Sequence, residues 1–240
     1  WLLPAVAATN HIEVGTAILQ LPLRNAVEMA QRFITIQALT RGRFIVGVGS
    51  GSTKEDFDAC GVDFDRRFSI FAQSISTIRR LCRGEVVGTA DLNPWPVNNG
   101  GPPILVGAWA SGKWLKRCAE EYDGWIASGG RTNFVTLREG IKRYRDLGGG
   151  RAVVATVPVD LTAETKSLDE EGPFNLRCGP EEASARLQRL AELGFDDVLL
   201  YRVRSAREQA LTPGRSHYEA DLDEENLAQI RAILPKKKRD

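Results

Sequence analysis

The stretch Gly42-Arg43-Phe44-Ile45-Val46-Gly47-Val48-Gly49-Ser50-Gly51 decides the fold class. Its centre, Phe44–Val48, is a short apolar run of the kind that forms a strand buried on both faces of a parallel sheet. The glycines that follow let the backbone turn sharply and approach a ligand, because they carry no Cβ. Their amides can then face an anion or a planar ring. The stretch therefore predicts a buried parallel strand that ends in a ligand-facing turn.

The same stretch is not a dinucleotide-binding fingerprint. That motif, G-x-G-x-x-G, requires a third glycine at position 52, where the chain has Ser52. The segment Thr53–Gly61 is acidic, and we expect it to be irregular rather than a helix. A tight turn without any ligand remains the structural alternative.

Short apolar runs alternate with helical patterns along the rest of the chain. The further strand candidates are Val14–Leu19, Pro103–Gly107, Gly124–Ala127, Ala152–Val159 and Asp197–Tyr201. Each is apolar on both faces, as buried parallel strands are. Alternation of this kind predicts βαβ units and a parallel sheet, either open or closed into a barrel.

The segments between the strands carry the 3.6-residue period of amphipathic helices. The expected buried stripes are Val27, Ala30, Ile34 and Ala38; Phe68, Phe71, Ala72, Ile75 and Ile78; and Ala183, Leu187, Leu190 and Ala191. Pro180 opens the third helix and Gly194 ends it. A last helix is expected from about Asp223 to Leu234, packing Leu227, Ile230 and Leu234. Gly84–Pro103 is predicted to be an inserted loop or hairpin, and Thr162–Cys178 a second irregular insertion.

Composition narrows the classes of protein that are possible. With 240 residues and 42% hydrophobic side chains, the chain can bury a large core, as one α/β barrel or as two small domains. The 32 Lys and Arg residues nearly balance the 31 Asp and Glu residues, which argues against a nucleic-acid partner. No signal peptide or run of 18 apolar residues is present, so no membrane segment is predicted.

The metal-binding residue types are sparse. The 4 cysteines form no C-x-x-C pair, and 2 histidines are too few for most histidine-based metal sites. No metal is therefore expected. Scattered thiols fit a reducing compartment, so we expect a cytoplasmic protein.

Two more loops follow strands and carry ligand-binding residue types. Gly107–Trp114 resembles a phosphate-binding P-loop, but Trp114 replaces the hydroxyl that would hold magnesium, so a nucleotide hydrolase is a weak rival. Ser128, Gly129 and Gly130 offer a hydroxyl and backbone amides, and Arg131 adds a charge. Together they suit a phosphate or the polar edge of a ring, although Gly129-Gly130 is also compatible with a flexible connection.

Two arginines alternate after the last strand. Arg202 and Arg204 are candidates to hold an anionic group of a cofactor or substrate, with ordinary surface arginines as the alternative.

In this order, the motifs resemble those of the luciferase-like monooxygenase family. The similar segments are Gly15–Leu19 with Leu21–Asn25, Leu39–Gly51, Gly61–Arg67, Gly101–Gly107, Asp123–Ile126 and Gly179–Glu182. The first pair is similar to the family's third strand and its loop, Leu39–Gly51 to the fourth strand, and Gly61–Arg67 to the helix after it. Gly101–Gly107 and Asp123–Ile126 are similar to the fifth and sixth strands, and Gly179–Glu182 is similar to the seventh helix. The likeness covers nearly the whole chain.

The resemblance implies a (β/α)8 barrel that binds FMN or the deazaflavin coenzyme F420 at the C-terminal ends of its strands. The branch with this fourth-strand pattern is most similar to deazaflavin-dependent oxidoreductases. We therefore expect coenzyme F420-dependent hydride transfer to or from a small organic substrate. The alternatives are an FMN-dependent monooxygenase and a non-catalytic flavin-binding relative.

Roles for individual residues follow from the same resemblance. Ala17 and Ile18 are expected to be joined by a cis peptide that forms a bulge behind the ring. Gly49, Ser50 and Gly51 are expected near the ring or its side chain. The cofactor's phosphate end is expected at Ser128, Gly129 and Gly130, with Arg131 beside it.

The resemblance also implies what the chain lacks. We count six of the family's eight βα units, and the first two are expected to precede Trp1. Their loops commonly supply proton donors near the ring, so no catalytic residue is named. Ser52 stands where the deazaflavin sugar-phosphate dehydrogenases carry an acidic residue. The family is commonly dimeric, so a homodimer is expected.

Overall fold

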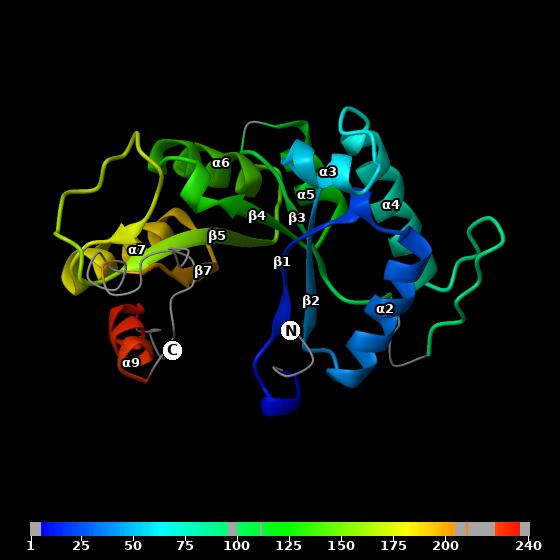
Figure 1. The fold of residues 1–240 in the computed structure, drawn as a ribbon, viewed down its shortest axis with the longest axis horizontal. Coiled ribbons are helices and arrows are strands. Elements are labelled where there is room, and N and C mark those ends of the chain that lie inside the picture. Colours follow the sequence, from blue (N-terminus) through cyan, green and yellow to red (C-terminus); the bar gives the residue numbers. More distant parts are fainter. Residues whose placement is uncertain (1–5, 96–99, 111, 205–209, 211–223, 236–240) are drawn as a thin grey trace. The chain divides into compact units, whose positions relative to one another are not determined.

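The computed structural model describes residues 6–95, 100–110, 112–204, 210 and 224–235. Its contacts divide the chain into two compact units, Trp1–Gly107 and Ala108–Asp240. In each unit parallel strands alternate with helices, as the elements labelled in Figure 1 show. The βαβ pattern predicted from the sequence is therefore present in both units.

The first unit contains three parallel strands: β1 (Val14–Gln20), β2 (Phe44–Gly49) and β3 (Ile104–Gly107). β1 pairs with β2 from Val14↔Phe44 to Gln20↔Gly49, and β2 pairs with β3 from Val46↔Ile104 to Val48↔Val106. All three strand predictions are confirmed to within one residue at each end. The C-terminal ends of the three strands consequently lie at one edge of the sheet.

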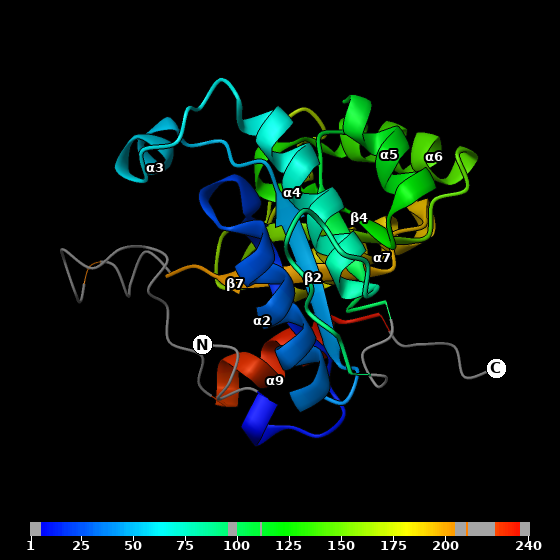
Figure 2. The same cartoon turned by 90° about the vertical axis from the view of Figure 1, so that its right-hand side faces the viewer.

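Helices α2 (Ala26–Leu39) and α4 (Arg67–Cys82) of this unit lie side by side (Figures 1 and 2). Asn25 caps the N-terminus of α2: its side chain accepts hydrogen bonds from the backbone N–H groups of Val27 (3.0 Å) and Glu28 (3.1 Å). Before it, Leu21–Leu23 forms a 3-10 turn, η1. The predicted stripes are largely buried, but Phe68 is 47% exposed and stacks on the Arg67 guanidinium.

The segment after β2 contradicts one prediction. Lys54–Ala59 is a helix, α3, where an irregular segment was expected. Phe57 is fully buried and anchors it, and Lys54 pairs with Asp58 at 2.6 Å one turn away. The predicted insertion Gly84–Pro103 contains an antiparallel bridge between Val87 and Ala90, as in a hairpin; its residues 96–99 lie outside the described residues.

The second unit is built around β5 (Arg151–Asp160). β4 (Gly124–Ser128) pairs with it in parallel from Gly124↔Arg151 to Ser128↔Ala155. β7 (Asp197–Arg202) pairs with it in parallel from Val153↔Asp197 to Val159↔Arg202. The two-residue strand β6 (Leu176–Arg177), which lies inside the predicted irregular insertion, pairs with the end of β5.

The helices of this unit are α5 (Lys113–Glu121), α6 (Phe134–Asp146), α7 (Pro180–Leu193) and α9 (Glu224–Ile233). α7 begins with Pro180 and ends at Gly194 with φ 101°, as predicted. Trp125 is fully buried, with ring centroids 5.5 Å from Tyr144 and 5.8 Å from Phe195. These aromatic rings pack together in the core of this unit.

The last helix differs from its prediction. Ile233 packs, with 1% exposure, whereas Leu227 and Leu234 are 38% and 47% exposed. The predicted packing is therefore wrong for Leu227 and Leu234, and Ile233 is buried instead. Asp223, its predicted start, lies outside the described residues.

The prediction that every strand is buried on both faces is wrong for β1 and β7. Gly15, Ala17 and Ile18 of β1 are exposed, and Leu199 of β7 is 42% exposed. Within the described part of its unit, β1 pairs with β2 alone. One side of β1 therefore has no described strand partner in this unit.

Candidate cofactor-binding site

An exposed isoleucine lies over two glycines at the C-terminal edge of the first unit. Gly49 and Gly107 end β2 and β3. A Cβ atom added to Gly49 would collide with Cδ1 of Ile18, and one added to Gly107 would lie 3.0 Å from the same atom. Ile18 is nevertheless 42% exposed. Its side chain therefore forms an apolar surface across the ends of these strands.

The backbone at Ile18 has the predicted geometry. The Ala17–Ile18 peptide bond is cis, and the pairing of β1 with β2 shifts register between Thr16 and Leu19. The predicted bulge is therefore confirmed. The role of Ala17 and Ile18 in binding a cofactor remains a prediction.

The turn after β2 closes onto α3. Gly51 has φ +80°, a conformation that favours glycine, and a Cβ there would lie 2.7 Å from Cε2 of Phe57. Gln20, at the end of β1, donates from Nε2 to Asp56 Oδ2 of α3 at 3.1 Å. Ser50 is half-buried between Gly49 and Gly51. The structure thus gives a packing reason for glycine at positions 49 and 51, in addition to the predicted ligand approach.

The second unit brings together the other predicted residues at the end of β4. Ser128 ends the strand, and Gly129–Arg131 forms a 3-10 turn, η3. A Cβ on Gly129 would lie 2.7 Å from Cγ2 of Val157, and one on Gly130 would lie 2.5 Å from the carbonyl oxygen of Thr156. Both glycines therefore lie in a turn that is packed tightly against β5.

Thr156 is a site residue that the sequence analysis missed. Its Oγ1 atom lies 3.0 Å from Oγ of Ser128. It is exposed, it has φ 56°, and it lies where the register of β5 on β7 shifts between Val154 and Val157. β-branched residues seldom adopt positive φ, and such outliers gather at functional sites. The available signal was that Thr156 is the one polar residue in the apolar run Ala152–Val159.

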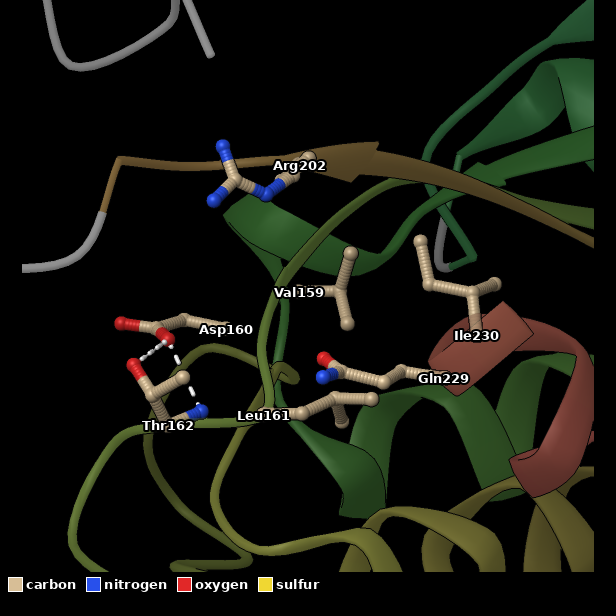
Figure 3. A pocket seen from close by; sticks show the side chains of 7 residues that line it. All are labelled: Val159, Asp160, Leu161, Thr162, Arg202, Gln229 and Ile230. Atoms are coloured by element: carbon tan, nitrogen blue, oxygen red, sulfur yellow. Dashed lines mark hydrogen bonds between the residues drawn. The ribbon is translucent and has the colours of Figure 1, made fainter. Parts of the chain in front are cut away.

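Arg202 lines a small cavity at the ends of β5 and β7, beside Gln229 and Ile230 of α9 (Figure 3). Asp160 in this cavity accepts hydrogen bonds from the backbone N–H and hydroxyl of Thr162, at 3.0 and 2.7 Å. The cavity measures about 20 Å³, which is room for a water molecule but not for a substrate group. Arg204 is 3% exposed. The role of both arginines in binding an anion remains a prediction.

The pKa values that burial raises belong to side chains in the cores rather than to these residues. Burial raises the pKa of the Cys82 thiol to about 11 and that of Cys118 to about 12. Burial also raises the pKa of Tyr144 to about 12. These groups stay protonated at neutral pH and act as packing groups.

Solved structures share this fold. An F420-dependent secondary alcohol dehydrogenase in complex with an F420-acetone adduct superposes with a TM-score of 0.68 at 17% identity, over 84% of this chain and 77% of that chain. The oxygenating constituent of 3,6-diketocamphane monooxygenase from Pseudomonas putida, in complex with FMN, gives 0.62 at 13% identity, over 83% and 75%. The predicted class is confirmed: a (β/α)8 barrel, of which this chain supplies about six units.

Sequence comparison identifies the family within this class. The family model described as luciferase-like monooxygenase matches residues 1–159. The chain therefore belongs to the luciferase-like monooxygenase family, whose relatives and structural neighbours with stated activities are oxidoreductases.

A curated relative is an F420-dependent glucose-6-phosphate dehydrogenase from Kineococcus radiotolerans, 27% identical over 84% of this chain and 75% of that protein. The chain spans 64% of the length of relatives from Mycobacterium tuberculosis. Among the described helices, none combines the length and apolar character needed to cross a membrane.

Proposed function

We propose that this chain belongs to a coenzyme F420-dependent oxidoreductase acting on a small organic substrate. The observation that carries the proposal is Ile18, 42% exposed and lying over Gly49 and Gly107 at the C-terminal edge of the first unit. Barrel enzymes bind their ligands at that end of the strands. The choice of coenzyme is supported by the F420-dependent relative and the F420-dependent structural neighbour.

The residues of the first unit fit the planar ring of such a coenzyme. When an exposed aliphatic side chain covers an apolar ring, the free energy of binding becomes more favourable by roughly 25 cal/mol per Å² of apolar surface removed from water. Gly49 and Gly107 leave the space in which Ile18 lies. Ile18 therefore orients the ring by contact, and Ala17, Ser50 and Gly51 surround it in the proposed site.

Taken by itself, the turn after β4 in the second unit fits a polar group of a cofactor, as the family resemblance predicts. Ser128 offers a hydroxyl, and Gly129, Gly130 and Arg131 form the turn beside it. When bound, the deazaflavin ring supplies the hydride-transferring centre, and the protein supplies orientation and exclusion of water. No proton donor among the described residues is assigned to the reaction.

The second candidate function is an FMN-dependent monooxygenase. The neighbour that binds FMN favours it, because the same fold carries that cofactor. The apolar surface of Ile18 would suit an isoalloxazine ring as well as a deazaflavin ring. The two candidates therefore differ in the cofactor that the full-length protein prefers.

Fluorescence titration of the full-length protein with coenzyme F420 and with FMN tests the choice. We expect saturable binding of coenzyme F420 at lower concentration than FMN. Tight binding of FMN with none of F420 would replace the proposal with the monooxygenase. Binding of neither would remove the cofactor proposal as a whole.

We also propose that the protein forms a homodimer. In the first unit Ile12, Leu39 and Trp95 are 46%, 60% and 58% exposed. Association would remove these apolar side chains from water, which is favourable by roughly 25 cal/mol per Å² of apolar surface. Light scattering on a size-exclusion column is expected to give twice the mass of the full-length chain, and a monomeric mass would contradict the proposal.

A further inference from the structure

The hydroxyl groups of Ser128 and Thr156 form a pair at the end of β4. Ser128 Oγ and Thr156 Oγ1 are 3.0 Å apart, and distance alone leaves open which one donates. A hydroxyl has one proton to donate and two lone pairs that accept. The direction of this hydrogen bond therefore depends on the other partners of the two groups.

The second partner of Thr156 fixes that direction. Thr156 Oγ1 also lies 2.7 Å from the carbonyl oxygen of Ala155. A carbonyl can only accept, so the Thr156 proton points to Ala155. Ser128 must then be the donor in the pair, and its single proton is directed to Thr156. The remaining lone pairs of Ser128 Oγ are left to accept.

The backbone holds this arrangement in place. The positive φ of Thr156, 56°, sets its hydroxyl beside β4, where Ser128 pairs with Ala155 in register. Gly130 lies against the Thr156 carbonyl, with room for no Cβ. Reversing the pair would require Thr156 to give up Ala155, leaving that carbonyl without this donor.

We propose that Ser128 is a hydrogen-bond acceptor for a hydroxyl of the ligand, such as the polyol chain of a ribityl group, rather than a donor to a phosphate. The inference rests on the proposed function, which places the cofactor's side chain at Ser128. A phosphate oxygen is itself an acceptor and meets only lone pairs on Ser128. The expected phosphate contact at Ser128 is thereby replaced by a polyol contact.

The same network limits what Ser128 can do. The chain of donors runs from Ser128 to Thr156 and ends at the Ala155 carbonyl, which is not a base. Ser128 therefore orients a ligand hydroxyl and does not remove its proton. It is a binding residue, with Thr156 as the residue that positions it.

The test uses three probes that share the deazaflavin ring. They are coenzyme F420, its phosphate-free form that keeps the ribityl chain, and the ring with a methyl group in place of that chain. Dissociation constants are measured by fluorescence for the wild type, for Ser128→Ala and for the control Ser69→Ala. The control removes an exposed hydroxyl that donates a hydrogen bond to the backbone carbonyl oxygen of Arg66. Circular dichroism melting curves check that each variant folds.

Ser128→Ala is expected to weaken both ribityl-bearing probes by the same factor, about fivefold for one neutral hydrogen bond. The ring without the chain should bind unchanged, and Ser69→Ala should alter none of the three. A loss confined to the phosphate-bearing probe would overturn the inference, as would no loss or an equal loss with all three. If the wild type binds none of the probes, the proposed function itself fails.

A second variant tests the direction of the hydrogen bond. Thr156→Val keeps the branched shape but removes the acceptor that holds the Ser128 proton. Both ribityl-bearing probes should then bind more weakly by the same factor, because the Ser128 hydroxyl is no longer held with its lone pairs toward the ligand, and the ring without the chain should bind unchanged. Unchanged binding of the ribityl-bearing probes would contradict the assigned arrangement.

Discussion

The Cδ1 atom of Ile18 lies too close to Gly49 for residue 49 to carry a Cβ atom unless Ile18 moves. The two residues come from adjacent strands, in which Gln20 pairs with Gly49. Ile18 remains 42% exposed on the outer side of this contact. The exposed apolar surface beside the glycine-rich turn is therefore formed by the Ile18 side chain, and not by bare backbone at the glycines.

Replacing Gly49 by alanine should displace Ile18 without unfolding the protein. The collision is with the end of a flexible side chain, and overpacking of this kind costs about 1–3 kcal/mol. Urea denaturation should show that loss, together with weaker binding of coenzyme F420. The control Gly150→Ala, whose Cβ would have an ordinary 3.4 Å contact, should change stability by no more than about 1 kcal/mol.

The double variant Ile18→Ala with Gly49→Ala separates the two effects. Removing Cδ1 relieves the collision, so the double variant should recover part of the stability lost by Gly49→Ala. A coupling of more than about 0.5 kcal/mol is expected for residues in contact. Strict additivity would show that the two residues do not compete for one space.

The positions of the main strands along the chain could be predicted because short apolar runs between helical patterns have few other interpretations. α3 was missed because a six-residue acidic helix has no stripe of its own; burial of Phe57 holds it in place. The end of α9 was misjudged because Ile233 and Leu234 are adjacent and equally apolar. A two-residue strand such as β6 is too short to leave a pattern.

The site was predicted in part. The positions of Ala17, Ile18 and the glycines could be carried over from a family resemblance, and the bulge at Ala17–Ile18 is confirmed. The role of Thr156 could not be predicted in this way, because threonine in a sequence does not indicate a positive φ. Its pairing with Ser128 depends on strand register, and residues 128 and 156 become neighbours only in the folded sheet.

Thr156→Gly should be at least as stable as Thr156→Val. A left-handed conformation costs an L-residue roughly 1–2 kcal/mol, which glycine avoids. Glycine loses roughly 0.5–1 kcal/mol through chain entropy. Valine retains the strain at φ 56° and loses both hydroxyl contacts. Urea denaturation of the two variants measures the difference, and a clearly less stable glycine variant would show that the strain is negligible.

Arg186 should be the most sensitive charged residue of α7. It is 4% exposed, pairs with Glu182 at 2.8 Å and donates to the carbonyl oxygens of Asn175 (3.0 Å) and Lys166 (2.6 Å). Arg186→Met leaves these acceptors unpaired and should lower the free energy of unfolding by about 3–5 kcal/mol.

The matched control for that substitution is Arg32→Met. Arg32 makes an exposed pair with Glu28 one turn away, with 63% and 52% of the two side chains exposed. Its loss should cost no more than about 0.5 kcal/mol. Equal effects of the two substitutions would contradict a structural role for burial at Arg186.

Two buried thiols should make the free energy of unfolding depend on pH in the alkaline range. Burial raises the pKa of Cys82 to about 11 and of Cys118 to about 12, from 9.0 in the unfolded chain. The folded state holds these protons longer, so their stabilisation is complete below pH 9.0 and is lost as pH rises through 11 to 12. Unfolding followed from neutral to alkaline pH should show the decline begin near pH 9.0 and end near pH 12, and a flat profile would contradict it.

Labelling provides a separate check on the same burial. Cys60 is exposed, whereas Cys82, Cys118 and Cys178 are buried. Iodoacetamide at about pH 8 should modify Cys60 well before the other three, because alkylation needs an accessible thiolate. Peptide mass spectrometry identifies the modified thiol, and labelling of Cys118 as fast as Cys60 would show that the core of the second unit is open.

The most direct test of the central claim is a fluorescence titration of coenzyme F420 against the full-length wild type and Ile18→Asp. Placing a carboxylate at the proposed ring surface should weaken binding by about tenfold or more, with little change in melting temperature because Ile18 is 42% exposed. Saturable binding to the wild type and its loss in the variant are the predicted result. Equal binding to both proteins, or binding of FMN alone by the wild type, would contradict the account.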